Sequence, residues 1–195
     1  TTMRLKEAIS QLIEQDKKGN YVFHSQDLRA IFFGETDRNF TRIIRDLVNE
    51  GFLVRASKGV FYNPSSRHFD GYTLERIAGT IRRGELCYLS QESVLSAHSI
   101  ISQQMMGTIT VMTTGKSGRY PIENLGVIEF TRTKKKVEDV MPKLLHDTNF
   151  LPHANAELAY TELKRAGRNM HLVDKEILEE VIHEQRDAKL PQYGR

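Results

Sequence analysis

A single cysteine, Cys87, is all that the 195 residues contain. One cysteine excludes an intramolecular disulfide, and it excludes the paired Cys-x-x-Cys groups of structural zinc sites. The composition therefore favours a protein of a reducing compartment. We expect neither a bound metal nor another cofactor.

The sequence also lacks an apolar run long enough to span a membrane, and no charged start followed by an apolar segment indicates a signal peptide. Its formal net charge is only +3, so binding to nucleic acid would have to come from local clusters of basic residues. With 39% hydrophobic residues the chain can bury a core. We expect a cytoplasmic protein of two small domains without a membrane partner.

Residues 1–66 are predicted to form a winged helix-turn-helix domain. Apolar residues recur at helical spacing in three segments, residues 3–15, 26–33 and 37–50. A β-prone run at residues 21–24 precedes the second helix, for which Ser25 is the expected N-cap. Residues 52–63 are typical of a β-hairpin with a basic tip, which would be the wing.

The third of these helices carries its basic residues on the side opposite its apolar stripe. The N-terminal residues of a recognition helix reach base edges in the major groove, where arginine binds guanine and asparagine binds adenine. We therefore predict that the DNA contacts come from this helix, from the residue before the second helix and from the wing. The candidates are Ser25, Arg38, Asn39, Thr41, Arg42, Arg45 and Lys58.

An alternative interpretation of the same helix stays open. Its arginines could form a solvated face that is balanced by Asp37, Asp46 and Glu50. Winged helices also serve as protein-binding modules, so the pattern alone does not decide between DNA and a protein partner.

Residues 67–195 are predicted to form a mixed α/β domain with a small sheet and a helical tail, so the overall class is α+β. The breaker at residues 63–66 marks the boundary. β-Prone runs at residues 108–113 and 127–132 are expected to share one sheet, with a turn-rich segment, residues 115–126, between them. Two helices are expected before these strands, one from about Leu74 to near Gly84 and one at residues 90–101. Three more are expected after them, at residues 137–145, 154–164 and 174–186.

A second group of basic residues occupies the segment between these two strands and the end of the second one. Its members are Lys116, Arg119, Arg132, Lys134, Lys135 and Lys136. Such a group suits an acidic partner or phosphate, and equally a sheet edge that lysines protect against unwanted pairing.

No constellation of catalytic residues emerges from the sequence. The stretch at Lys116 and Ser117 lacks the first glycine of a phosphate-binding loop, because Thr110 occupies that position. Ser93 and His98 are five residues apart on an expected helix, which directs them away from each other. We therefore do not expect an enzyme.

The stretch Tyr88–His98, followed by Thr108–Val111 and Gly126–Phe130, resembles the middle of AbiEi-type antitoxins. In that family a winged helix precedes the pattern Tyr-x-Ser-x-x-Ser-x-Leu-x-x-His and a short β segment. The resemblance covers most of residues 4–135 and is weaker in the C-terminal helices. Ser99-Ile100 replaces the usual Gly-Leu of the family.

The resemblance implies an antitoxin of a bacterial type IV toxin–antitoxin system, which serves phage defence or the maintenance of mobile elements. The first domain would be a transcriptional repressor of its own operon and bind inverted repeats in double-stranded operator DNA. The resemblance implies that the second domain counteracts a nucleotidyltransferase-like toxin without a stable complex. Our candidates for this role are Lys116, Arg119, Arg132 and Lys134. The residues that match the recognition helix and the wing are Arg38, Asn39, Thr41, Arg42, Arg45 and Lys58, and the resemblance gives Ser93 and His98 a packing or capping role.

Two other functions remain open. One is an ordinary winged-helix transcription regulator whose second domain binds a small ligand or dimerises, with no toxin involved. The other is an enzyme that modifies a toxin or a nucleotide. A neighbouring nucleotidyltransferase gene would favour the antitoxin.

Overall fold

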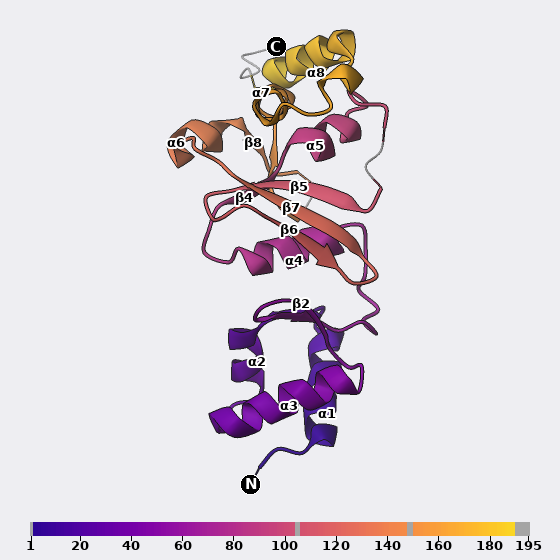
Figure 1. Cartoon of the computed structure of the whole chain (residues 1–195), viewed down its shortest axis with the longest axis vertical. Coiled ribbons are helices and arrows are strands. Elements are labelled where there is room, and N and C mark those ends of the chain that lie inside the picture. Colours follow the sequence, from indigo (N-terminus) through magenta and orange to yellow (C-terminus); the bar gives the residue numbers. More distant parts are fainter. Residues whose placement is uncertain (1, 104–105, 148–149, 190–195) are drawn as a thin grey trace, which may run out of the picture. The chain divides into compact units, whose positions relative to one another are not determined.

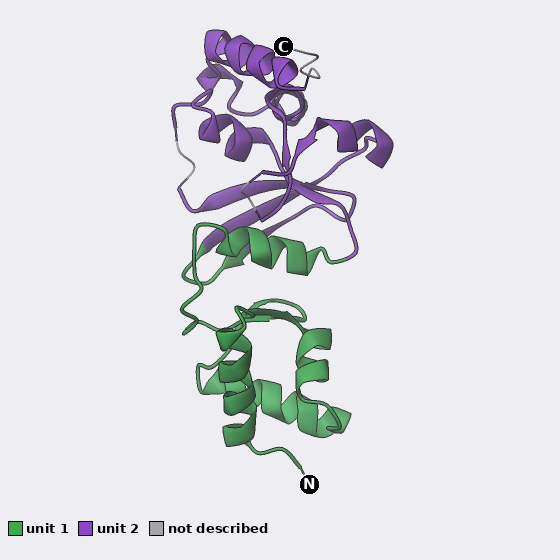
Figure 2. Cartoon of the chain, turned by 180° about the vertical axis from the view of Figure 1, so that it is seen from behind, with its two compact units in different colours: residues 1–83, 121–125 green, residues 84–120, 126–195 purple. Residues whose placement is uncertain are grey.

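The computed structural model describes residues 2–103, 106–147 and 150–189, and its helices and sheets give the expected α+β class. The chain divides into two compact units (Figure 2). Unit 1 consists of residues 1–83 and 121–125, and unit 2 consists of residues 84–120 and 126–195.

Unit 1 combines helices with a small antiparallel sheet (Figure 1). The helices are α1 (Leu5–Lys17), α2 (Ser25–Ile31), α3 (Asp37–Asn49) and α4 (Thr73–Ile81), and the strands are β1 (Val22–His24), β2 (Val54–Ser57) and β3 (Val60–Tyr62). The sheet order is β1-β3-β2, because Tyr62 of the central strand lies opposite both Val22 and Val54. The first strand along the chain thus pairs with the last, which leaves β2 of the β2–β3 hairpin at one edge of the sheet.

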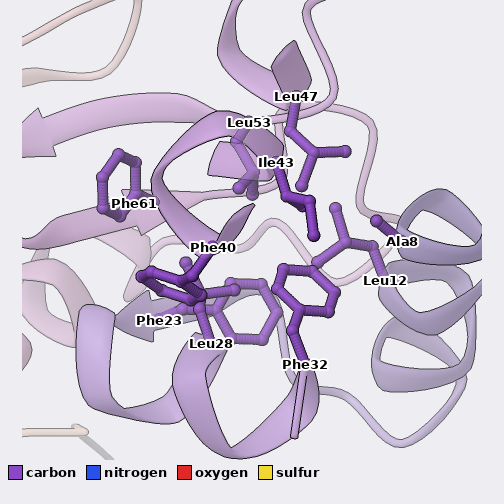
Figure 3. Packing of buried hydrophobic residues seen from close by; sticks show 10 residues of the cluster. All are labelled: Ala8, Leu12, Phe23, Leu28, Phe32, Phe40, Ile43, Leu47, Leu53 and Phe61. Carbon is purple, nitrogen blue, oxygen red and sulfur yellow. The ribbon is translucent and has the colours of Figure 1, made fainter. Parts of the chain in front are cut away.

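The core of unit 1 is built from the apolar faces of α1, α2 and α3 and from the sheet (Figure 3). It contains Ala8, Leu12, Phe23, Leu28, Phe32, Phe40, Ile43, Leu47, Leu53 and Phe61. The stripe predicted for the third helix is confirmed by Phe40, Ile43 and Leu47, which are all buried. Full burial of such a side chain contributes about 1.5–3 kcal/mol. The opposite side of α3 is therefore held toward solvent.

The cap of α2 differs from the expectation, because His24 and not Ser25 occupies the N-cap position. The Nδ1 atom of His24 accepts a hydrogen bond from the backbone of Gln26 at 3.2 Å, and Asp27 accepts one from the backbone of His24 at 2.8 Å. Strand β1 runs directly into α2, so its last extended residue becomes the cap and Ser25 becomes the first helical residue.

The border of unit 1 also differs from the predicted one, since the units divide after Arg83 and not after residue 66. Helix α4 belongs to unit 1, where the Thr73 and Tyr21 hydroxyls are 2.9 Å apart. Beyond α4, Arg83 donates two hydrogen bonds of 2.8 Å to the Asp27 carboxylate. These bonds fix the segment after the Pro64 breaker to the helices before it.

Unit 2 is built on a mixed sheet with the strand order β6-β7-β5-β4-β9-β8. The strands are β4 (Cys87–Leu89), β5 (Thr108–Thr113), β6 (Gly118–Ile122), β7 (Gly126–Arg132), β8 (Leu144–Leu145) and β9 (His153–Ala154). The helices are α5 (Gln91–Ala97), α6 (Val137–Val140), α7 (Ala156–Ala166) and α8 (Lys175–Asp187), with 3-10 turns at Met141–Lys143 and Met170–Leu172. The expectation that the two β-prone runs share one sheet is confirmed, since β5 and β7 pair in parallel.

Two segments of unit 2 differ from the expectation. Strand β6 lies in the segment predicted to consist of turns, and the helix predicted for residues 137–145 ends at Val140. Pro142 has no amide hydrogen, so the chain passes through a 3-10 turn into β8. The last two helices of the tail are confirmed, and Asn155 and Asp174 cap them.

Candidate functional site

An open hollow at the start of α3 gathers most of the predicted recognition residues. It has a volume of about 660 Å³ and is lined by Thr2, Thr36, Asp37, Arg38, Asn39, Thr41, Arg42 and Arg45. The side chain of Thr36 caps the helix by accepting a hydrogen bond from the backbone of Asn39 at 3.3 Å. This cap defines where the first turn begins and which residues face outward from it.

Arg38 and Arg45 present their guanidinium groups to solvent from this turn and the next. Arg38 is exposed and has no ion pair within residues 2–103, 106–147 and 150–189. The Arg45 side chain is 66% exposed and lies 3.5 Å from Asp46, a long contact for an ion pair. Both groups are therefore accessible to an external anion.

Arg42, by contrast, is held within the protein. Its Nε and Nη2 atoms donate to the Asn39 side-chain oxygen at 3.0 and 2.7 Å, and its Nη1 atom donates to Asp46 at 3.1 Å. Nη2 also donates to the carbonyl oxygen of Met3 at 3.1 Å. The structure therefore uses Arg42 to join α3 to the start of the chain.

Asn39 is also occupied by internal hydrogen bonds. Its side chain accepts from Arg42, as described above, and donates to Glu35, and the residue is only 9% exposed. Thr41 is exposed, but its hydroxyl donates to the carbonyl oxygen of Asp37 at 2.9 Å. On this side of α3 the side chains that remain accessible to an external ligand are therefore those of Arg38 and Arg45.

Two of the acidic residues named for α3, Asp37 and Asp46, have basic partners. Asp37 lies 2.7 Å from Arg29, whose guanidinium group sits 4.1 Å from the centre of the Phe40 ring. Asp46 is shared by Arg42 and Arg45. The interpretation of α3 as a solvated face requires that acidic residues balance its arginines. Asp46 does this for Arg42 and Arg45, but no described carboxylate pairs with Arg38.

A second hollow lies between α3 and the β2–β3 hairpin. It has a volume of about 370 Å³ and a largely apolar wall, and its lining residues are Ser25, Phe40, Thr41, Ile44, Arg45, Val48, Asn49, Arg55, Gly59 and Phe61. Gly59 forms the hairpin tip at φ +73°, and its carbonyl oxygen accepts from the backbone of Ser25 at 2.8 Å. The tip, with the exposed Lys58 beside it, is thereby fixed to the start of α2.

Arg55 is a basic residue of this region that the sequence analysis missed. It is exposed on β2 and lines the second hollow, and its Nε atom donates to the carbonyl oxygen of Ser57 at 3.4 Å. The alternation of the hairpin strands was the signal that could have identified it, because Val54 and Ala56 on either side point the other way.

The basic residues predicted for unit 2 lie in two different places. Arg119 lies on β6 and pairs with Glu129 of β7 at 3.6 Å. Arg132 and Lys134 lie at and beyond the end of β7, where the backbone of Arg132 donates to the hydroxyl of Ser117 at 2.8 Å. These two residues line a cleft of about 610 Å³, which we call the α7 cleft. Its lining residues are Gln91, Met112, Thr131, Arg132, Thr133, Lys134, Lys135, Glu162, Arg165 and Ala166.

The carboxylate of Glu162 forms part of the floor of the α7 cleft and is 3% exposed. The Tyr88 hydroxyl donates to it at 2.6 Å, and the Ser90 hydroxyl donates to its other oxygen. Burial raises the pKa of Glu162, while these hydrogen bonds and the nearby Lys135 and Arg165 oppose that rise. Burial also raises the pKa of Tyr88, and the hydrogen bond to Glu162 adds to this.

Ser93 and His98 line the same small hollow of about 180 Å³, whereas the sequence analysis expected them to be directed away from each other. Ser93 exchanges two hydrogen bonds with Thr110, its hydroxyl accepting from that backbone at 2.8 Å and its backbone donating to the Thr110 hydroxyl at 3.1 Å. These bonds attach α5 to β5. Burial lowers the pKa of His98, and the neighbouring His153 lowers it further.

The comparisons with known proteins bear on the fold. In the described part of the chain, no helix is both long and apolar enough to cross a membrane. No family model matches the sequence, and no curated protein is significantly similar to it. A crystal structure of the Rv2827c protein from Mycobacterium tuberculosis has a similar fold, with a TM-score of 0.60 and 16% identity over 92% of this chain and 72% of that chain. The chain therefore shares its fold with that mycobacterial protein.

Proposed function

We propose that unit 1 is a winged helix that binds double-stranded operator DNA, and that the protein is the antitoxin and autorepressor of a type IV toxin–antitoxin system. The element order α1-β1-α2-α3-β2-β3 with the sheet order β1-β3-β2 supports the winged helix. In such an arrangement α2 and α3 form the helix-turn-helix, α3 enters the major groove, and the β2–β3 hairpin contacts the backbone beside it.

The observation that carries the proposal is the outward display of accessible positive charge on α3 and the hairpin. Arg38 and Arg45 are accessible on the helix, and Lys58 is exposed at the hairpin tip. A guanidinium group can bind guanine in two hydrogen bonds, whereas a lysine at the tip neutralises phosphate. Arg38 is thus the proposed base-reading residue, and Lys58 is the proposed phosphate contact.

The test is a set of binding titrations with DNA from upstream of the protein's own gene, at several salt concentrations. We expect Arg38→Ala to weaken operator binding ~5-fold to ~150-fold and to reduce the preference over scrambled DNA, because one bidentate base contact is worth about 1–3 kcal/mol. Lys58→Ala should weaken binding to all DNA sequences alike. The slope of the logarithm of the binding constant against the logarithm of the salt concentration should become shallower by about 0.9.

Lys18→Ala is the matched control, because Lys18 is exposed on unit 1 but lines neither hollow. Its affinity should stay close to that of the unsubstituted protein. Unchanged operator affinity in both Arg38→Ala and Lys58→Ala would overturn the DNA-binding proposal.

The antitoxin role of unit 2 is supported by the resemblance described above and by its basic residues. We propose that Lys116, Arg119, Arg132 and Lys134 take part in counteracting a nucleotidyltransferase-like toxin. In co-expression with the adjacent toxin gene, the full chain should restore growth, and the double substitution Arg132→Ala and Lys134→Ala should not, while operator binding persists. Full rescue by the double variant would argue against these residues.

A further inference from the structure

The α7 cleft lies at the carboxyl ends of two parallel strands. β5 and β7 pair from Thr108 opposite Val127 to Thr113 opposite Arg132, and the cleft begins where they end, at Met112 and Arg132. Helix α7 supplies another part of the wall. Crevices outside the carboxyl ends of parallel strands are common ligand sites, and about 610 Å³ lies within the range of small-molecule pockets.

Positive charge in this cleft exceeds the negative charge. Arg132, Lys134, Lys135 and Arg165 line it, and among the residues that the structure describes none of them has a carboxylate within 4.0 Å. Glu162 is the acidic lining residue, and both of its oxygens already accept hydrogen bonds from Tyr88 and Ser90. The cleft therefore suits a ligand with more than one negative charge.

The floor also presents a hydrogen-bond donor that lacks a strong partner. Gln91 is 2% exposed, and its side-chain oxygen accepts from Arg168 at 3.1 Å, which fixes the orientation of the amide. Its amide nitrogen therefore faces Met112, whose sulfur is only a weak acceptor, at 3.4 Å. An oxygen acceptor on a ligand would satisfy this donor better than the thioether does.

The backbone of Gln91 is itself unusual. Its φ of +52° lies in the left-handed region, which a residue with a long side chain rarely adopts. Such conformations persist where the surroundings hold them, and they are concentrated at binding sites. Here the contact with Arg168, which also pairs with Glu92 at 2.8 Å, holds the residue in place.

We propose that the α7 cleft binds a nucleoside di- or triphosphate, with the phosphates among Arg132, Lys134, Lys135 and Arg165 and the nucleoside against Met112 and the Gln91 amide. The site shares Arg132 and Lys134 with the proposed toxin-counteracting surface, but its occupation requires neither toxin nor DNA. A bounded cleft with a buried polar floor favours a small molecule over a nucleic-acid strand, which would track along an open groove.

The test is isothermal titration of the purified full-length chain with ATP, GTP, CTP and UTP, and with pyrophosphate as the phosphate-only probe. We expect one site per chain, with at least one nucleotide binding at least 10-fold more tightly than pyrophosphate. Arg165→Ala should lower the affinity for that nucleotide at least 10-fold. Lys164→Ala removes the same charge from the adjacent position of α7, outside the lining residues, and should change the affinity less than 2-fold.

The floor is tested with Gln91→Glu, which preserves size and the acceptor for Arg168 but removes the donor and adds a negative charge. We expect it to abolish nucleotide binding while thermal unfolding shows a folded protein. Absence of binding by all four nucleotides, equal affinity for pyrophosphate, equal losses in Arg165→Ala and Lys164→Ala, or tighter binding of a single-stranded oligonucleotide would each overturn the proposal. Operator binding by the same preparation reports separately on unit 1.

Discussion

Arg42 and Arg38 lie four residues apart on α3, and the structure gives them different tasks. Arg42 donates hydrogen bonds to Asn39, Asp46 and Met3, whereas Arg38 has no such partner among the described residues. The first therefore stabilises the helix and the start of the chain. The second is available for an external ligand.

This difference predicts opposite patterns for two alanine variants. Arg42→Ala should lower the free energy of unfolding by about 1–2 kcal/mol, because it removes charged hydrogen bonds that solvent screening weakens only in part. Arg38→Ala should change stability by less than about 0.5 kcal/mol and act on DNA affinity alone. Urea unfolding of both variants measures this. Equal stability of the two would contradict the task assigned to Arg42.

The Asp27–Arg83 ion pair predicts a dependence of stability on pH. The hydrogen bonds from Arg83 hold the pKa of Asp27 below its usual value, against the opposing effect of burial. The unfolded chain then binds more protons than the folded one, so the contribution is present above about pH 4, the usual pKa of aspartate, and is lost as the pH falls below it.

The change that tests this pair is Asp27→Asn, which retains an acceptor for the backbone of His24. It should lower stability at pH 7 by about 0.5–1 kcal/mol, a value suited to a partly exposed pair, and reduce the loss of stability between about pH 5 and pH 3. Urea unfolding across this pH range provides the measurement. Arg83→Ala should reduce the pH dependence to a smaller degree, because the hydrogen bond from the His24 backbone still lowers the pKa of Asp27. If stability falls as steeply in acid in both variants as in the unsubstituted protein, the pH dependence does not come from this pair.

At the scale of elements, the helices of unit 1 were predictable because each buries one face of a strong apolar repeat. Strand β6 was not, since it carries Gly118 and Pro121, which single-sequence patterns associate with turns. Strands β4, β8 and β9 are only two or three residues long, too short for an alternation to show. Their place in the sheet depends on neighbours distant in sequence.

The candidate site was also predictable only in part: its local features follow from the sequence, and its tertiary contacts do not. A helical wheel is enough to turn Arg38 and Arg45 outward, and the spacing of Arg42 and Asp46 by four residues could have indicated their pairing. The bond from Arg42 to Met3 and the approach of Arg165 to Arg132 required the tertiary fold. The α7 cleft was therefore hidden in the sequence, although three of its four basic residues, Arg132, Lys134 and Lys135, had been singled out.

The cap of α3 gives a prediction for the whole element. Thr36→Ala removes the hydroxyl that accepts from the Asn39 backbone and should lower the free energy of unfolding by about 1 kcal/mol. DNA affinity should fall as well, because the first turn positions Arg38. Thr36→Ser keeps the acceptor and should restore both properties, as thermal unfolding and titration would show. Wild-type stability in Thr36→Ala would mean that the cap contributes nothing.

At the scale of the whole molecule, the turn between β6 and β7 makes both units discontinuous in sequence, because residues 121–125 belong to unit 1. The hydroxyl of Tyr62, the last residue of β3, donates to the carbonyl oxygen of Glu123 at 2.7 Å. Burial raises the pKa of Tyr62, as expected for a hydroxyl that remains a neutral donor. A strand of unit 1 thus holds a turn that the sequence places far from it.

Tyr62→Phe removes this hydrogen bond while preserving the ring. We expect a loss of about 1 kcal/mol in the free energy of unfolding and faster amide exchange across residues 121–125. Exchange in α7 should not change, which makes that helix the internal control. Hydrogen exchange followed by mass spectrometry measures both regions, and uniform acceleration over the whole chain would show a global rather than a local effect.

The same turn limits how this protein can be dissected or recombined. The chain passes from unit 1 to unit 2 after Arg83, returns for residues 121–125 and leaves again. No single cleavage releases either unit with all of its own residues. To exchange unit 1 between two related proteins, residues 121–125 would have to be transferred together with residues 1–83, and a single crossover between the genes cannot do this.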